Sequence, residues 1–77
     1  MKNYINLTTH NGVTVSLPIS KIQRIGSNQH GGIVDIGRSF DYEVEQRPSE
    51  ILRRIAEALK TQEDKVLDIL TNVEISP

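Results

Sequence analysis

The sequence predicts an α+β domain, in which a small antiparallel β-sheet, built as a meander of β-hairpins, is followed by a long C-terminal α-helix. Apolar and polar residues alternate through 4–8 and 13–17, as they do in strands with one buried face. Asn11-Gly12 lies between these runs and is typical of a hairpin turn. Beyond residue 49 the apolar residues recur at helical spacing. We therefore expect a single domain that uses all 77 residues.

The first hairpin is predicted by five apolar residues at alternate positions: Ile5, Leu7, Val13, Val15 and Leu17. Between the two strands, Asn11-Gly12 supplies the positive φ angles that a tight turn needs. Pro18 ends the second strand, because its nitrogen has no hydrogen to donate to a ladder.

The next stretch predicts shorter elements. Ile19, Ile22 and Ile25 recur at a spacing of three, which favours one helical turn followed by a short strand. The polar, Gly-rich residues that follow are typical of a loop. We expect the helical turn at 18–22, the loop at 27–32, strands at 33–36 and 40–44, and a turn at 37–39.

The C-terminal part predicts the long helix. Ser49 is a plausible N-cap, and Glu50 suits the positive end of the helix dipole. Steps of three and four connect the predicted apolar stripe, which contains one polar member: Leu52, Ile55, Leu59, Gln62, Val66, Ile69 and Val73. One helix over about 49–72 accounts for this pattern. The alternative is two helices broken near Lys60–Asp64, with Thr61 capping the second.

A continuous helix implies assembly. About 24 residues span roughly 36 Å, whereas a five-residue strand spans about 17 Å. The sheet of residues 1–46 then leaves the end of the helical part, 49–73, uncovered. Another copy of the chain would cover it, so we expect a homo-oligomer formed through Val66, Ile69, Leu70 and Val73.

Composition excludes several classes of function. The formal net charge is −1, from nine basic and ten acidic residues, which argues against a general nucleic-acid binder. The chain has no cysteine, so disulfides, thiolate metal sites and cysteine catalysis are absent. No apolar run reaches about 18 residues, the length that a membrane-spanning helix needs. We expect a cytoplasmic protein with no metal, no cofactor and no membrane partner.

The candidate site is a set of ligand-binding residues without a catalytic group. Gly31-Gly32 allows a close approach of backbone to ligand, polar side chains flank it, and arginine forks near a helix start suit phosphates. The nine candidates are Asn28, Gln29, His30, Gly31, Gly32, Arg38, Arg47, Arg53 and Arg54. The only histidines, His10 and His30, both fall in or beside predicted turns, which favours exposed loop residues. No Ser/His/acid grouping is present, so we do not expect an enzyme.

Several short segments resemble the FlbD-like family of small flagellar or swarming-motility proteins. They are Ile5–Thr8, Asn11-Gly12, Val15–Ile22, Tyr42–Val44 and the helix start at Ser49–Ile51. The similarity covers about residues 4–55 and consists of apolar and turn positions. It implies a protein-interaction adaptor or regulator and carries over no catalytic residue.

The chain is also similar, in size, architecture and expected oligomerisation, to small phage-encoded proteins that sequester nucleotide immune signals without cleaving them. The leading functional hypothesis is therefore a non-enzymatic, oligomeric protein, of phage origin, that captures a small anionic nucleotide-like ligand. The alternative is the FlbD-like adaptor, whose partner is another protein.

Overall fold

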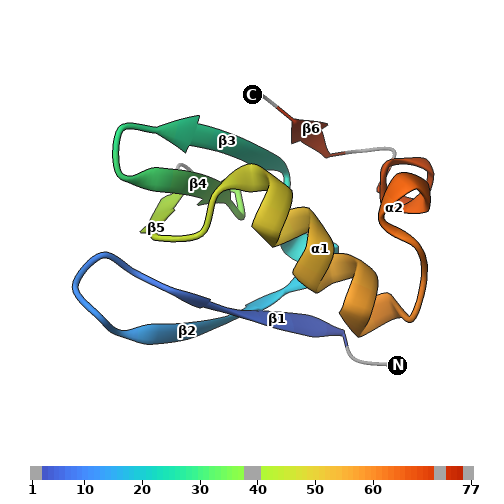
Figure 1. Ribbon diagram of the computed structural model, residues 1–77, viewed down its shortest axis with the longest axis horizontal. Coiled ribbons are helices and arrows are strands. Elements are labelled where there is room, and N and C mark those ends of the chain that lie inside the picture. The colour runs from blue at the N-terminus through green and yellow to red at the C-terminus, as the bar shows by residue number, and fades with distance from the viewer. Residues whose placement is uncertain (1–2, 38–40, 71–72, 76–77) are drawn as a thin grey trace.

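The computed structural model of the chain describes residues 3–37, 41–70 and 73–75 (Figure 1). The α+β class is confirmed, but the predicted single sheet and single long helix are wrong. The described residues form two small sheets and two short α-helices. The elements are β1 (Tyr4–Thr8), β2 (Thr14–Pro18), η1 (Ile19–Lys21), β3 (Arg24–Asn28), β4 (Gly31–Asp35), β5 (Asp41–Val44), α1 (Pro48–Leu59), α2 (Glu63–Ile69) and β6 (Glu74–Ile75).

The first hairpin is confirmed. Strands β1 and β2 pair antiparallel, with Ile5 opposite Leu17. The turn differs from the predicted one, because Gly12 (φ +84°) is its only residue with a positive φ. The N–H of Gly12 donates to the carbonyl oxygen of Thr9 at 2.9 Å. The connection is therefore a longer turn that ends in a left-handed glycine, and Asn11 keeps an ordinary φ.

A second sheet holds the strands in the order β5-β4-β3-β6. β3, β4 and β5 are antiparallel neighbours, and β6 joins β3 in parallel through two residue pairs. The chain does not continue the first sheet, because Pro18 has no N–H and the 3₁₀ turn η1 redirects the chain before β3. One antiparallel meander thus becomes two sheets.

Backbone hydrogen bonds join the two sheets at the end of β1. Thr9 and Val44 form an isolated antiparallel bridge, and the N–H of Glu45 donates to the carbonyl oxygen of Thr8 at 2.8 Å. The side-chain oxygen of Gln46 accepts the N–H of Thr8 at 2.9 Å. Glu45 and Gln46, which follow β5, thereby occupy the hydrogen-bonding groups of Thr8 at the C-terminal end of β1.

The predicted loop at 27–32 is also wrong, since β3 runs to Asn28 and β4 starts at Gly31. Only Gln29 and His30 form the turn. The side-chain oxygen of Asn28 accepts the N–H of His30 at 2.9 Å, which lets an asparagine turn replace a longer loop.

Helix α1 begins one residue before the predicted N-cap. Arg47 occupies the N-cap position without a side-chain hydrogen bond, and Pro48 is the first helical residue, whose preset φ suits that place. Ser49 therefore lies inside the helix. Its buried residues are Ile51, Ile55, Ala56 and Ala58.

The chain breaks after Leu59, at the place that the alternative prediction proposed. Lys60 adopts a left-handed conformation (φ 55°, ψ 47°), and its N–H donates to the carbonyl oxygens of Ala56 and Glu57. Thr61 donates its N–H to Ala56 at 3.0 Å, which completes the C-terminal cap. Gln62, rather than Thr61, is the N-cap residue of α2.

The core lies between the sheets and α1 (Figure 1). Its buried residues are Ile5, Leu7, Leu17, Ile19, Ile22, Ile25, Val34, Val44, Ile51, Ile55, Ala56, Ala58 and Val66. Val66 is the one residue of α2 that reaches it. Among the described helices, none is long and apolar enough to cross a membrane.

Candidate functional site

The predicted ligand loop lies at the tip of the β3–β4 hairpin, and its polar side chains bond to one another and to β5. The amide nitrogen of Asn28 donates to Glu43 at 3.2 Å, and the amide of Gln29 lies 3.3 Å from His30 Nε2. The tip is therefore an ordered polar cluster.

Gly31 and Gly32 are buried. The space that a Cβ would occupy at each of them is filled by backbone atoms, so it is not available to a ligand. A Cβ on Gly31 would lie 2.6 Å from the carbonyl oxygen of Glu45, and one on Gly32 would overlap that of Gln46. The two glycines are thus explained by the close passage of residues 44–46 over β4.

His10 lies beside this tip, although the spacing of the two histidines in the sequence did not predict that they would meet. The ring centroids of His10 and His30 are 5.6 Å apart, and Nε2 of His10 lies 3.9 Å from a carboxylate oxygen of Glu43. In the described parts of the chain, no group of three or more His, Cys, Asp or Glu residues is placed to hold a metal ion.

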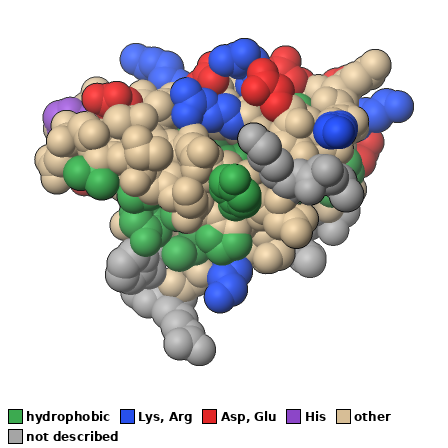
Figure 2. Space-filling view, turned by 90° about the horizontal axis from the view of Figure 1, so that it is seen from below, with side chains coloured by type: hydrophobic (Ala, Val, Ile, Leu, Met, Phe, Trp, Pro, Cys, Tyr) green, Lys and Arg blue, Asp and Glu red, His purple; other side chains and the backbone are tan. Residues whose placement is uncertain are grey.

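The predicted arginines of α1 are held in ion pairs. Arg53 donates to Glu50 at 2.6 Å and to Glu57 at 3.2 Å, and Arg54 donates to Glu50 at 3.1 Å. Hydrogen bonds from Arg53 and then Arg54 lower the pKa of Glu50, and the bond to Glu50 raises the pKa of Arg53. Figure 2 shows this kind of alternation, with acidic and basic side chains along one edge of the molecule.

The nine predicted residues do not form one pocket. Arg53 and Arg54 belong to α1, whereas residues 28–32 form the hairpin tip. Arg47 is exposed and directly follows Gln46, whose carbonyl oxygen lies against Gly32. Arg38 lies outside the described residues.

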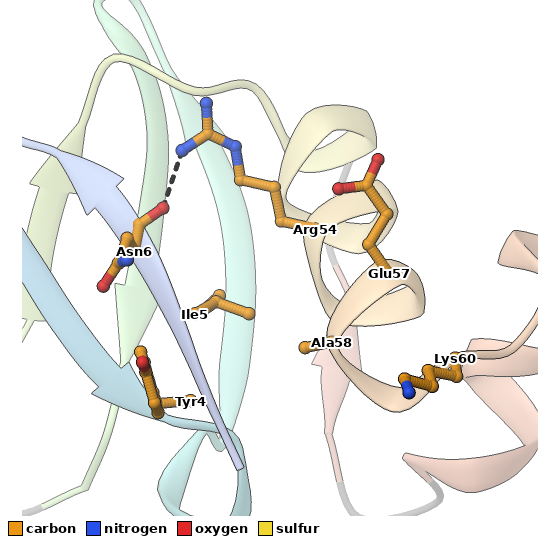
Figure 3. Close-up of a pocket in the computed structure, with 7 residues that line it drawn as sticks. All are labelled: Tyr4, Ile5, Asn6, Arg54, Glu57, Ala58 and Lys60. Carbon is orange, nitrogen blue, oxygen red and sulfur yellow. Dashed lines mark hydrogen bonds between the residues drawn. The ribbon is translucent and has the colours of Figure 1, made fainter. Parts of the chain in front are cut away.

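A groove lies between β1 and α1, with a volume of about 480 Å³ (Figure 3). β1 contributes Tyr4, Ile5 and Asn6, and α1 with its cap contributes Arg54, Glu57, Ala58 and Lys60. Ile5 and Ala58 are buried and apolar, whereas the other side chains are polar or only partly buried. We name this depression the β1–α1 groove.

Arg54 closes one end of the β1–α1 groove. Its Nη1 donates to the carbonyl oxygen of Asn6 at 2.6 Å, which ties the helix to the strand (Figure 3). Because Glu50 also binds Arg54, the charge of this guanidinium is compensated by a neighbouring carboxylate.

Lys60 stands at the other end of the β1–α1 groove, where its side chain extends from the end of α1 (Figure 3). It is the one non-glycine residue with a positive φ in the described parts of the chain. Within those parts, its ammonium group has no hydrogen-bond or ion-pair partner. A positive φ outside glycine costs about 1 kcal/mol or more, so this position is a candidate for a functional role.

A second depression, of about 550 Å³, is lined mainly by apolar residues: Asn3, Ile19, Ser20, Ile22, Leu59, Ile69, Leu70 and Val73. Ile69 and Leu67 on α2 remain 52% and 51% exposed. Three of the four residues predicted to form an oligomer, Ile69, Leu70 and Val73, therefore line this apolar depression, and Val66 is buried. Hydrophobic side chains also gather over the middle of the face in Figure 2.

No protein-family model, curated protein or solved structure matches the chain. Of the residues that line the β1–α1 groove, only Arg54 was among the predicted site residues; the others are Tyr4, Ile5, Asn6, Glu57, Ala58 and Lys60. The polar positions of β1 in the alternating pattern mark Asn6 as outward-facing, but nothing in the sequence marks the left-handed lysine.

Proposed function

We propose that this protein is a non-enzymatic adaptor that binds a segment of another protein in the β1–α1 groove. The observation that carries the proposal is an outer strand edge facing a helix across a depression of about 480 Å³. Strand edges and helix-lined grooves are recurrent sites of peptide recognition. The resemblance to FlbD-like proteins, which implies an interaction role, points the same way.

The adaptor has better support than anion capture at the predicted residues. Arg53 and Arg54 already have carboxylate partners, and backbone covers Gly31 and Gly32. A phosphate would compete with Glu50 for both guanidinium groups.

The test is selection of binding peptides from a displayed library of random linear peptides, followed by chemical-shift mapping on the ¹⁵N-labelled protein. We expect enriched peptides to shift the amides of residues 4–6 and 54–60. Lys60→Ala should weaken binding, whereas Lys65→Ala, on an exposed position of α2, should leave it unchanged. A library that yields no binder, or shifts confined to other residues, would contradict the proposal.

A second candidate is capture of a nucleotide-like anion at the hairpin tips. It is favoured by the convergence of His10 and His30 beside Asn28 and Gln29. Imidazole N–H and side-chain amide groups there are hydrogen-bond donors for an anion, although the carboxylate of Glu43 lies 3.9 Å from Nε2 of His10.

Isothermal titration with cyclic and ADP-ribose-type nucleotides tests this candidate. We expect heat of binding that is lost in His10→Gln. Absence of heat with millimolar nucleotide would contradict the candidate.

A further inference from the structure

The direction of the backbone groups of β1 follows from two hydrogen bonds at the ends of its pairing with β2. Ile19 donates its N–H to Asn3 at 2.8 Å, and Thr9 donates its N–H to Val13 at 2.8 Å. In an antiparallel pair, hydrogen-bonded positions alternate with positions that face away. Odd-numbered residues of β1 therefore bond to β2, and Tyr4, Asn6 and Thr8 face the outer edge.

Part of that outer edge is already occupied. Thr8 has both partners, since its N–H donates to Gln46 and its carbonyl accepts from Glu45. The carbonyl of Asn6 accepts from Arg54. What remains open, within the described residues, is the N–H and C=O of Tyr4 and the N–H of Asn6. These three groups border the β1–α1 groove.

The opposite wall of the β1–α1 groove supplies a small side chain and a free cation. Ala58 has a short side chain, so the surface of α1 is recessed beside β1. Glu57 is already paired with Arg53. Lys60 alone brings an unpaired charge to the groove among the described residues. The groove therefore offers unpaired main-chain groups on one side and a positive charge at one end.

We propose that the β1–α1 groove binds an acidic, extended segment of a partner protein as an additional strand on β1, with Lys60 pairing with a carboxylate of that segment. This inference rests on the proposed adaptor function and specifies its partner. The three open groups are spaced as donors and acceptors are spaced along a strand, and an extended backbone matches that spacing. A compact anion would satisfy Lys60 and leave the strand edge unpaired.

The probe is a set of acetylated, amidated seven-residue peptides of alternating Thr and Val, with one Glu placed at each position in turn. We expect one Glu position to bind best in fluorescence anisotropy. Because every second amide of an added strand faces its neighbour, N-methylation of one alternate set of amides should weaken binding about tenfold. N-methylation of the other set should have little effect.

Two proline variants give a matched test from the protein side. Asn6→Pro removes the open N–H that borders the β1–α1 groove, and Ser16→Pro removes the corresponding N–H on the opposite edge of the same hairpin. Both variants lose the hydrogen bond from Ser16 to the Asn6 side chain, so they share that defect. We expect Asn6→Pro to lower peptide affinity about tenfold and Ser16→Pro to leave it unchanged.

Lys60→Gln tests the charge. The affinity for the best Glu peptide should fall about threefold, because an exposed ion pair contributes little. When that Glu is replaced by Gln, Lys60→Gln should cause no further loss of affinity. Lys65→Gln is the matched control, and circular dichroism checks that each variant is folded.

The outcomes separate the inference from the function on which it rests. Peptide binding that tolerates both N-methylated sets and Asn6→Pro overturns strand addition and leaves the adaptor standing. If neither these peptides nor the displayed library yields a binder, both fail. Concentration-dependent slowing of hydrogen exchange at Tyr4 and Asn6 without peptide would assign the edge to a second copy and overturn the inference.

Discussion

Lys60 is the residue at which backbone geometry and the candidate site meet. A left-handed C-terminal position of a helix is usually glycine, because a Cβ there is crowded. Lysine brings a favourable charge to the negative end of α1 and places an ammonium group at the β1–α1 groove.

We expect Lys60→Gly to raise the free energy of unfolding by about 1 kcal/mol, since glycine relieves the positive φ. Urea denaturation measures this change. The same variant should bind an acidic peptide more weakly, so stability and binding move in opposite directions. A variant that loses stability would show that the conformation at residue 60 is not strained.

Gly32 is required by packing alone. A Cβ there would overlap the carbonyl of Gln46 and lie 3.0 Å from Cδ1 of Ile51. We expect Gly32→Ala to cost about 3 kcal/mol, measured by urea denaturation, because backbone has to shift. Ser27→Ala, at the paired and exposed position of β3, is the control and should change stability by less than about 0.5 kcal/mol.

At the scale of the element, Glu50 organises the charged face of α1. Arg53 and Arg54 hold its pKa below the ordinary value of 4.5. A lowered pKa means that the ionised carboxylate stabilises the fold above about pH 4.5 and that this contribution is lost as the pH falls through the folded-state pKa.

We therefore expect Glu50→Gln to have a lower melting temperature than the wild type at neutral pH, with the difference shrinking on acidification. The difference should also shrink with added salt, because the pairs are exposed. Glu45→Gln, at an exposed position outside α1, is the control. A difference that persists unchanged at about pH 2 would indicate a role other than charge.

At the scale of the whole molecule, α2 folds back over the core and leaves an apolar surface around Ile69. The homo-oligomer stays a prediction, now placed on this surface in place of a long helix. An exposed isoleucine beside an apolar depression is a surface that a second copy would bury.

We expect the wild type to be an oligomer in light scattering and Ile69→Asp to lower its mass while the secondary structure persists. Val66→Ala is the contrasting variant. It should cost about 2 kcal/mol, because Val66 is fully buried, and leave the mass unchanged. A wild type that is monomeric at all concentrations would contradict the prediction.

Much of the first half of the fold was predictable because its signals are local. Alternation placed Ile5 and Leu17 on the buried side of one hairpin, and Pro18 ended the strand where expected. For the candidate site, the sequence indicated the polar hairpin tip and Arg54, but neither the carboxylates that pair with the arginines nor the opposite wall of the groove.

The apolar spacing of the C-terminal half suggested one helix because both real helices bury residues against the same core. Ile55 and Val66 are both buried and both fit the helical spacing, although the helix is broken between them. No Gly or Pro marks the break in the sequence. Lysine is a good helix former, so helix propensity does not predict that α1 ends at Lys60 in a left-handed conformation. The position of the break depends on tertiary packing.

By itself, the sequence determined the α+β class, the first hairpin and the absence of cysteine chemistry, because composition and short-range alternation decide these. Only the tertiary structure decided the split into two sheets, the end of α1 at Lys60, the meeting of His10 with His30 and the open edge of β1. Each of these depends on contacts between residues far apart in the chain, whose pairing is set by which arrangement buries the core and satisfies the backbone.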